Sequence, residues 1–228
     1  MPNARDVSRL KNFSDAVFAL SATLLVVTLE VPNSYAALTE AVAGFPAFAL
    51  SFAAIISLWH NHREFFAHYP LDDNRTVILN SILLFIILLY VYPLKLLTQL
   101  IVERFFGAEA TIIAEMTPGE VQGLYFIFAI AAFGVFAVFA LLHAHAWHAR
   151  AQFNLDESGQ RRLRHELYSY SVLVGLSLAS IGATLLSLGL SWGLPIWLFL
   201  LSPIFEVLRW QLYGKKQAQK PDAASEDA

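Results

Sequence analysis

Long apolar segments follow one another along the chain, with short polar stretches between them. Six can be recognised, near residues 10–31, 44–66, 76–101, 118–148, 166–190 and 193–210. A helix needs roughly 20 apolar residues to cross the hydrocarbon core of a bilayer. The pattern therefore predicts an all-α membrane protein with six transmembrane helices.

Local signals refine the ends of these segments. The sequence Thr-Pro-Gly-Glu at residues 117–120 has the form of a capping box with proline at the first helical position, which predicts a helix start. Pro203 is expected to kink the last segment. Residues 151–165 are expected to form a short polar linker. The organisation expected is a six-helix transmembrane domain over residues 1–213, followed by a disordered tail over residues 214–228.

Positive charges separate according to the side of the membrane. Thirteen of the fifteen Lys and Arg lie before the first segment, between the second and third, between the fourth and fifth, or around the end of the sixth. The opposite side has only Lys95 and Arg104. The positive-inside rule then places both termini in the cytoplasm. We expect a multi-pass protein of the cell membrane.

Composition agrees with this class and excludes several others. The chain is 57% hydrophobic and 14% charged, against about 25% charged in soluble domains. It contains no cysteine, which excludes disulfides and thiolate metal sites. Its net charge of −3 and lack of a basic motif argue against a nucleic-acid partner. Catalytic motifs such as His-Glu-x-x-His or a phosphate loop are missing, so we do not expect an enzyme.

Asp15 is the unusual residue of the first segment, because an ionisable group within a membrane helix is costly and marks a candidate functional site. Ser14 and Asp15 could cap a helix that begins at Ala16. Such a helix would reach only about 24 Å by Val31, short of a hydrocarbon core of roughly 30 Å. We therefore expect the helix to begin near Ser8, with Asp15 about two turns inside.

Inside the membrane, Asp15 needs polar partners, on neighbouring helices or on a neighbouring subunit. Trp59 and His62 lie at the cytoplasmic end of the second segment, and Asn80 lies at the same end of the third. We expect a buried polar cluster that holds the first three helices in register. Proton sensing by Asp15 is a secondary alternative.

One face of the first segment carries a stripe at spacings of three and four residues. It consists of Ala16, Leu20, Thr23, Leu24, Val27 and Val31. Such a stripe can simply face lipid or a neighbouring helix. Thr23 differs from the rest, because its hydroxyl can bond its own backbone or face water.

Histidines raise a second possibility. His145 and His148 are three residues apart and could share a metal, with His143 off that face. An interfacial cluster beside Trp147 is the simpler interpretation, so we expect no metal or other cofactor. A membrane metal or redox protein that also uses His60 and His62, and a secondary transporter, are the alternatives to a channel.

The string from Arg9 to Leu25, with its Arg-x-x-x-Phe-Ser-Asp pattern, closely resembles the first helix of the transmembrane protein 175 family. Members of this family are potassium channels, and the animal members are endosomal and lysosomal. Trp59, His62 and Asn80, followed by a proline at position 93, add to the resemblance. A single unit of six spans is similar to the prokaryotic members, which assemble as tetramers.

The resemblance implies a potassium-preferring channel in which the first helix of each of four subunits lines a central pore. Leu20, Leu24 and Val27 would form the apolar constriction, and Thr23 a hydroxyl ring that favours K⁺ as the permeant ion. The signature Arg9, Phe13, Ser14 and Asp15, together with Trp59, His62 and Asn80, would form a structural polar network. No Thr-Val-Gly-Tyr-Gly loop is present to supply a carbonyl filter.

Overall fold

The computed structural model describes residues 4–27, 32–106, 116–153 and 155–186. Every regular element in these ranges is helical. The elements are α1 (Ala4–Val27), α2 (Tyr35–Ala43), α3 (Phe45–His68), α4 (Asn74–Phe106), α6 (Pro118–His148), the 3₁₀ turn η1 (Arg150–Gln152) and α7 (Glu157–Leu185).

Most of these helices are long and apolar enough to cross a bilayer. Four qualify alone, namely α1, α4, α6 and α7, and the pair α2 and α3, bent by 43°, makes a fifth. The protein is therefore an all-helical, multi-pass membrane protein. The sixth expected segment, 193–210, and the expected tail, 214–228, lie outside the described residues.

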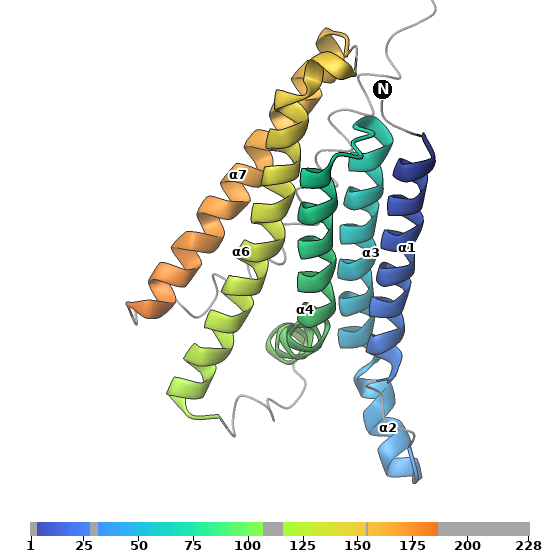
Figure 1. The fold of residues 1–228 in the computed structure, drawn as a ribbon. Coiled ribbons are helices and arrows are strands. Elements are labelled where there is room, and N and C mark those ends of the chain that lie inside the picture. Colours follow the sequence, from blue (N-terminus) through green and yellow to red (C-terminus); the bar gives the residue numbers. More distant parts are fainter. Residues whose placement is uncertain (1–3, 28–31, 107–115, 154, 187–228) are drawn as a thin grey trace, which may run out of the picture.

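The helices form a continuous row. α1 packs against both α3 and α4, while α6 packs against α4 and α7 (Figure 1). Core side chains such as Phe18, Ile55, Phe66, Leu83 and Phe139 are buried between them. Gly134 of α6 lies so close to α4 that a Cβ atom there would come within 3.2 Å of Ile86. A small residue at that position allows the two helices to approach closely.

One end of the row gathers the beginning of α1, the end of α3, the beginning of α4, the end of α6 and the beginning of α7 (Figure 1). This end carries Arg9, Lys11, Arg63, Arg75, Arg150, Arg161, Arg162 and Arg164. We call it the basic end. Its composition is the one that the positive-inside rule assigns to the cytoplasmic side.

The sequence predicted a capping box at the start of α6 and offered a cap at Ser14 and Asp15 as the alternative for α1. The capping box before α6 is confirmed, because Thr117 accepts a bond from the Glu120 N–H and Glu120 binds the Thr117 N–H at 2.7 Å. Capping by Ser14 and Asp15, the alternative for α1, is wrong, because α1 continues through both residues. Asp15 lies well inside the helix.

The linker expected over residues 151–165 is wrong over most of its length, because α7 begins at Glu157. Asp156 caps α7 by accepting the Gly159 N–H at 2.8 Å. Arg162 and Glu166, one turn apart, form an ion pair of 2.9 Å that stabilises the polar first turns of α7. Hydropathy alone misses such a charged but helical stretch.

Two further features go beyond the expected segments. α2 is a helix of nine residues, too short to be recognised as a span. Pro93 lies inside α4. Figure 1 shows that α4 turns sharply in its later part, as expected where proline removes a backbone hydrogen bond and its ring displaces the preceding turn.

Candidate functional site

Helix α1 has two opposite faces. The buried face carries Ser14, Phe18, Ser21 and Leu25, at spacings of four, three and four residues. The opposite face, which we call the exposed stripe, carries Ala16, Leu20, Thr23, Leu24 and Val27. Leu20 is 50% exposed and Val27 is 72% exposed, whereas Leu24 is partly covered. Leu24, at the edge of the stripe, packs against the core, whereas Leu20, Thr23 and Val27 are exposed.

A chain of hydrogen bonds joins the buried face of α1 to two neighbouring helices. The Asn80 amide of α4 donates to the Ser14 hydroxyl at 2.9 Å. The Asn80 carbonyl oxygen lies 2.7 Å from His62 Nε2 of α3. Since a carbonyl can only accept, His62 must carry its proton on Nε2 in this contact. All three residues are buried, so the chain fixes the rotation of α1 against α3 and α4.

His62 is also held by aromatic side chains. Its ring centroid lies 5.4 Å from that of Phe18 in α1 and 4.8 Å from that of Phe66 in α3. These are ordinary distances for aromatic pairs. The imidazole therefore has a fixed position between the two helices.

Asp15 makes a separate contact at the same level. Its carboxylate accepts a hydrogen bond of 2.8 Å from the indole N–H of Trp59 in α3. The Arg63 guanidinium stacks over the Trp59 ring at 5.6 Å. Unlike Ser14, Asp15 is exposed on the side of α1. The two neighbouring residues thus hold α1 through different partners.

The other two signature residues lie elsewhere. Phe13 is 60% exposed, and Arg9 is exposed as well. Their spacing of four residues places them in line with Leu20 and Val27, as an extension of the exposed stripe toward the basic end. The structure brings Ser14, Asp15 and their partners together, but it does not bring Arg9 or Phe13 into that network.

Thr23 lies on the exposed stripe with its hydroxyl turned back to the helix. It donates a hydrogen bond of 2.9 Å to the Ala19 carbonyl. This contact uses the single hydroxyl proton, so the oxygen retains its acceptor capacity. Thr23 can therefore offer an oxygen atom to a cation.

A second polar network, which the sequence reasoning missed, joins α3, α6 and α7 near the basic end. Glu166 of α7 lies 3.4 Å from His143 Nε2 of α6 and accepts a hydrogen bond from the Tyr69 hydroxyl at 3.2 Å. Arg162 connects Glu166 to Glu64 of α3, at 2.9 and 3.3 Å. The signals that could have revealed it are His143 within an apolar helix and the four-residue spacing of Arg162 and Glu166.

The remaining histidines of this region face different partners. His145 Nε2 lies 2.9 Å from the Asp73 carboxylate, and His148 donates from Nδ1 to the Ala144 carbonyl at 2.7 Å. Burial raises the pKa of Asp73, but hydrogen bonds from Thr76 and His145 outweigh this and hold it below its usual value. Across the described ranges, no three His, Asp or Glu side chains converge as a metal site would require.

The fold and the first helix together define a class: multi-pass helical membrane proteins in which an amphipathic first helix is anchored by polar contacts. The family model described as "Endosomal/lysosomal potassium channel TMEM175" matches residues 9–90. That stretch contains the whole Ser14–Asn80–His62 chain.

Individual relatives agree with this match. A potassium channel of Marivirga tractuosa is 32% identical over 192 residues, covering 82% of this chain and 76% of its own. A potassium channel of Chamaesiphon minutus is 26% identical, covering 84% of this chain and 91% of its own. The chain belongs to the TMEM175 potassium channel family.

Solved structures share the fold. A variant of the potassium channel MtTMEM175, crystallised with a nanobody–MBP fusion, has a TM-score of 0.74 at 30% identity, over 93% of this chain and 94% of that one. A lysosomal potassium-selective channel TMEM175 homolog from Chamaesiphon minutus has a TM-score of 0.62 at 24% identity, over 90% of this chain and 98% of that one.

Proposed function

We propose that this chain forms a potassium-preferring cation channel in the cell membrane, as a homotetramer with α1 lining a central pore. Membership of the TMEM175 family supports conduction of potassium, as do the two relatives named potassium channels. The observation that carries the pore assignment is the opposition of the two faces of α1. Contacts with α3 and α4 use one face, and the exposed stripe, apart from the partly covered Leu24, is left for other copies or for ions.

Four copies of the exposed stripe would supply a narrow apolar passage. Leu20, Leu24 and Val27 lie on successive turns and would form stacked apolar layers. An apolar constriction can close a pore by excluding water from it. The chain contains no carbonyl filter sequence, and we assign selectivity to side chains on this helix.

Thr23 is the polar group available for that purpose. In a tetramer, four Thr23 oxygens at one level would replace part of the hydration shell of an ion. Each Thr23 hydroxyl donates its hydrogen bond to the Ala19 carbonyl of the same helix, so its oxygen can coordinate an ion in the pore. Neutral oxygens bind a monovalent cation weakly, which favours rapid passage and a modest preference for K⁺.

The polar network would act as the support of this pore. Ser14, Asp15, Trp59, His62 and Asn80 hold one side of α1 and thereby orient the stripe on the other. Phe13 and Arg9, at the basic end of the exposed stripe, would then lie where the copies of α1 approach one another.

Ion flux into liposomes that contain the protein tests this proposal directly. We expect vesicles that contain the protein to take up potassium faster than sodium. Leu20→Asn should raise the leak, because a polar ring hydrates the constriction, and Thr23→Ala should reduce the preference for potassium. Val26→Asn is the matched control, since Val26 is also exposed on α1 but points about 100° away from Val27.

Three results would contradict the channel. The first is unchanged flux in both Leu20→Asn and Thr23→Ala. The second is a rise in leak in Val26→Asn equal to that in Leu20→Asn. The third is flux that saturates at low potassium concentration, as expected of a transporter.

The tetramer has its own test. Native mass spectrometry of the detergent-solubilised protein should give four chains per particle, and a monomer would contradict the assembly.

A further inference from the structure

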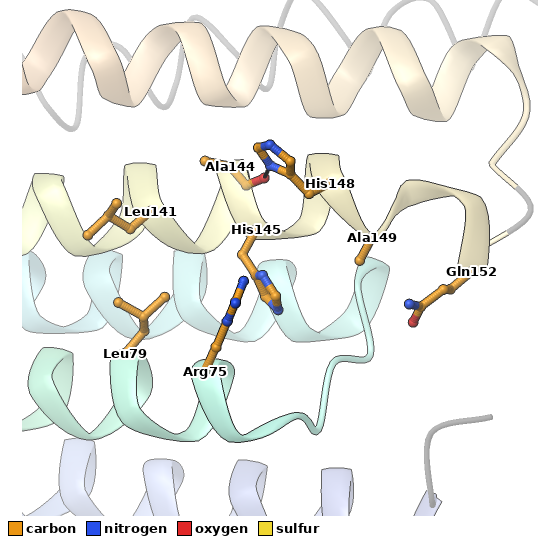
Figure 2. Close-up of a pocket in the computed structure, with 8 residues that line it drawn as sticks. All are labelled: Arg75, Leu79, Leu141, Ala144, His145, His148, Ala149 and Gln152. Atoms are coloured by element: carbon orange, nitrogen blue, oxygen red, sulfur yellow. Dashed lines mark hydrogen bonds between the residues drawn. The ribbon is translucent and has the colours of Figure 1, made fainter.

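A groove opens between the beginning of α4 and the end of α6. It holds about 510 Å³ and is lined by Arg75, Leu79, Leu141, Ala144, His145, His148, Ala149 and Gln152. Figure 2 shows Arg75 next to His145, with Leu79 and Leu141 facing each other about one turn further along the two helices. The lining therefore changes from polar to apolar as the groove runs into the membrane.

The polar end of the groove offers a positive charge. Arg75 is exposed, and its guanidinium makes no hydrogen bond or ion pair with the side chains that the structure describes. The nearby acid, Asp73, is already engaged: it contacts His145 at 2.9 Å and accepts hydrogen bonds from Thr76 and from the Arg75 backbone N–H. An anion at the Arg75 side chain therefore meets a guanidinium whose donors are still available.

The groove lies at the depth of the lipid headgroups. Arg75 and His148 stand at the ends of the spans Asn74–Glu103 and Pro118–His148. Trp147, beside His148, packs under the Arg150 guanidinium at 4.6 Å. Tryptophan and arginine at a span end are typical of the interface between hydrocarbon and headgroups.

We propose that this groove binds an anionic phospholipid, with the phosphate at Arg75 and an acyl chain along Leu79 and Leu141. Arginine is the side chain best suited to phosphate, because its planar donors match two phosphate oxygens. Basic pockets between transmembrane helices are known to hold anionic headgroups. The apolar part of the lining favours a lipid over free phosphate, which would leave Leu79 and Leu141 uncovered. This site lies on α4, α6 and η1, and none of its lining residues belongs to α1.

Native mass spectrometry of the intact, detergent-solubilised protein tests the proposal without measuring flux. Phosphatidylglycerol, phosphatidylcholine or inorganic phosphate is added in separate titrations. We expect phosphatidylglycerol to bind at the lowest concentration, and Arg75→Gln to weaken that binding about tenfold. Arg150→Gln, the matched control, removes the same charge at the same end but outside the groove, and should change binding less than twofold.

Leu141→Asn separates the lipid from a free anion. It should weaken phosphatidylglycerol binding and leave any binding of inorganic phosphate unchanged. The proposal is overturned if both arginine variants lose phosphatidylglycerol equally, which indicates diffuse surface charge. It is also overturned if phosphate competes as well as the lipid, or if no lipid binds because a neighbouring copy covers the groove. Unchanged thermal melting of Arg75→Gln shows that the loss is not one of folding.

Discussion

The side-chain amide of Asn80 donates a hydrogen bond of 2.9 Å to the hydroxyl of Ser14, between two helices that are otherwise joined by apolar contacts. Both residues have no exposed surface. The Ser14 proton is used on the Leu10 carbonyl, so the hydroxyl acts as donor and acceptor at once. A rotation of α1 would break this contact, which makes it a direct link between packing and the direction of the exposed stripe.

Removal of the Asn80 side chain should therefore destabilise the protein. In Asn80→Ala, the His62 Nε2–H loses its acceptor and the Ser14 hydroxyl loses one of its two partners, and an unsatisfied buried polar group costs about 1–3 kcal/mol. Unfolding of the purified protein in mixed detergent and SDS micelles measures this. Ser81→Ala, which removes an exposed hydroxyl one position further, should change stability by less than about 0.5 kcal/mol. Equal stability of the two variants would refute the role of Asn80.

The contact between Asp15 and Trp59 allows a double-mutant cycle. Asp15→Asn keeps an oxygen that can accept the indole N–H, whereas Asp15→Ala does not. We expect Asp15→Ala and Trp59→Phe each to cost about 1 kcal/mol, and the double variant to cost clearly less than their sum. The same unfolding assay applies. Strict additivity would show that the bond contributes nothing.

Substitution of Glu166, the buried acid of α7, should destabilise the protein far more than substitution of Glu157, an exposed acid of the same helix. Glu166 is 5% exposed and contacts His143, Tyr69 and Arg162. Glu166→Leu removes a hydrogen-bond partner from the buried His143 ring and Tyr69 hydroxyl, which costs about 1–3 kcal/mol, while the partly exposed Arg162 keeps its contact with Glu64. Glu157→Ala at the exposed first turn is the control and should cost less than about 0.5 kcal/mol. Similar unfolding midpoints for the two variants would contradict this account.

Asp73 should give the fold a defined acid sensitivity. Burial opposes its ionisation, but hydrogen bonds from Thr76 and His145 lower its pKa on folding. A lowered pKa stabilises the fold above the unfolded value, about pH 4, and this stability is lost as the pH falls through the folded value. Because the carboxylate is partly exposed, the contribution should be only about 0.5–1 kcal/mol.

Melting curves at pH 7 and pH 3 test that sign. Asp73→Asn should be less stable than the parent protein at pH 7, with a gap that narrows at pH 3. Glu157→Gln, at an exposed acid, should show no gap at either pH. A gap for Asp73→Asn that is the same at both pH values would contradict the linkage.

The sequence predicted the helical membrane class because apolar segments of about 20 residues have the length that a transmembrane helix requires. It predicted α6 to the residue, since Thr117 and Glu120 form a specific cap. It placed the start of α7 too late, because packing and i,i+4 ion pairs, rather than hydropathy, make the stretch after Asp156 helical. The short helix α2 has no signal that hydropathy could detect.

The candidate site was only partly readable from the sequence. Family resemblance and the cost of a membrane carboxylate singled out Asp15, and Trp59 lay among the expected partners. The contact of His143 with Glu166 joins residues 23 positions apart on two helices, and no local pattern encodes that distance. The exposed positions of Phe13 and Arg9 likewise depend on which face of α1 packs, which only the tertiary contacts decide.

Accessibility of single cysteines tests the central claim most directly, because the chain has no cysteine of its own. Val26 and Val27 are both exposed at the same depth, but they point about 100° apart. A positively charged, thiol-specific reagent is added to liposomes that carry Leu20→Cys, Val27→Cys or Val26→Cys. The account predicts that the reagent blocks potassium flux through the Leu20 and Val27 variants and leaves the Val26 variant open. Block of the Val26 variant together with free flux through the other two would contradict a pore lined by the exposed stripe of α1.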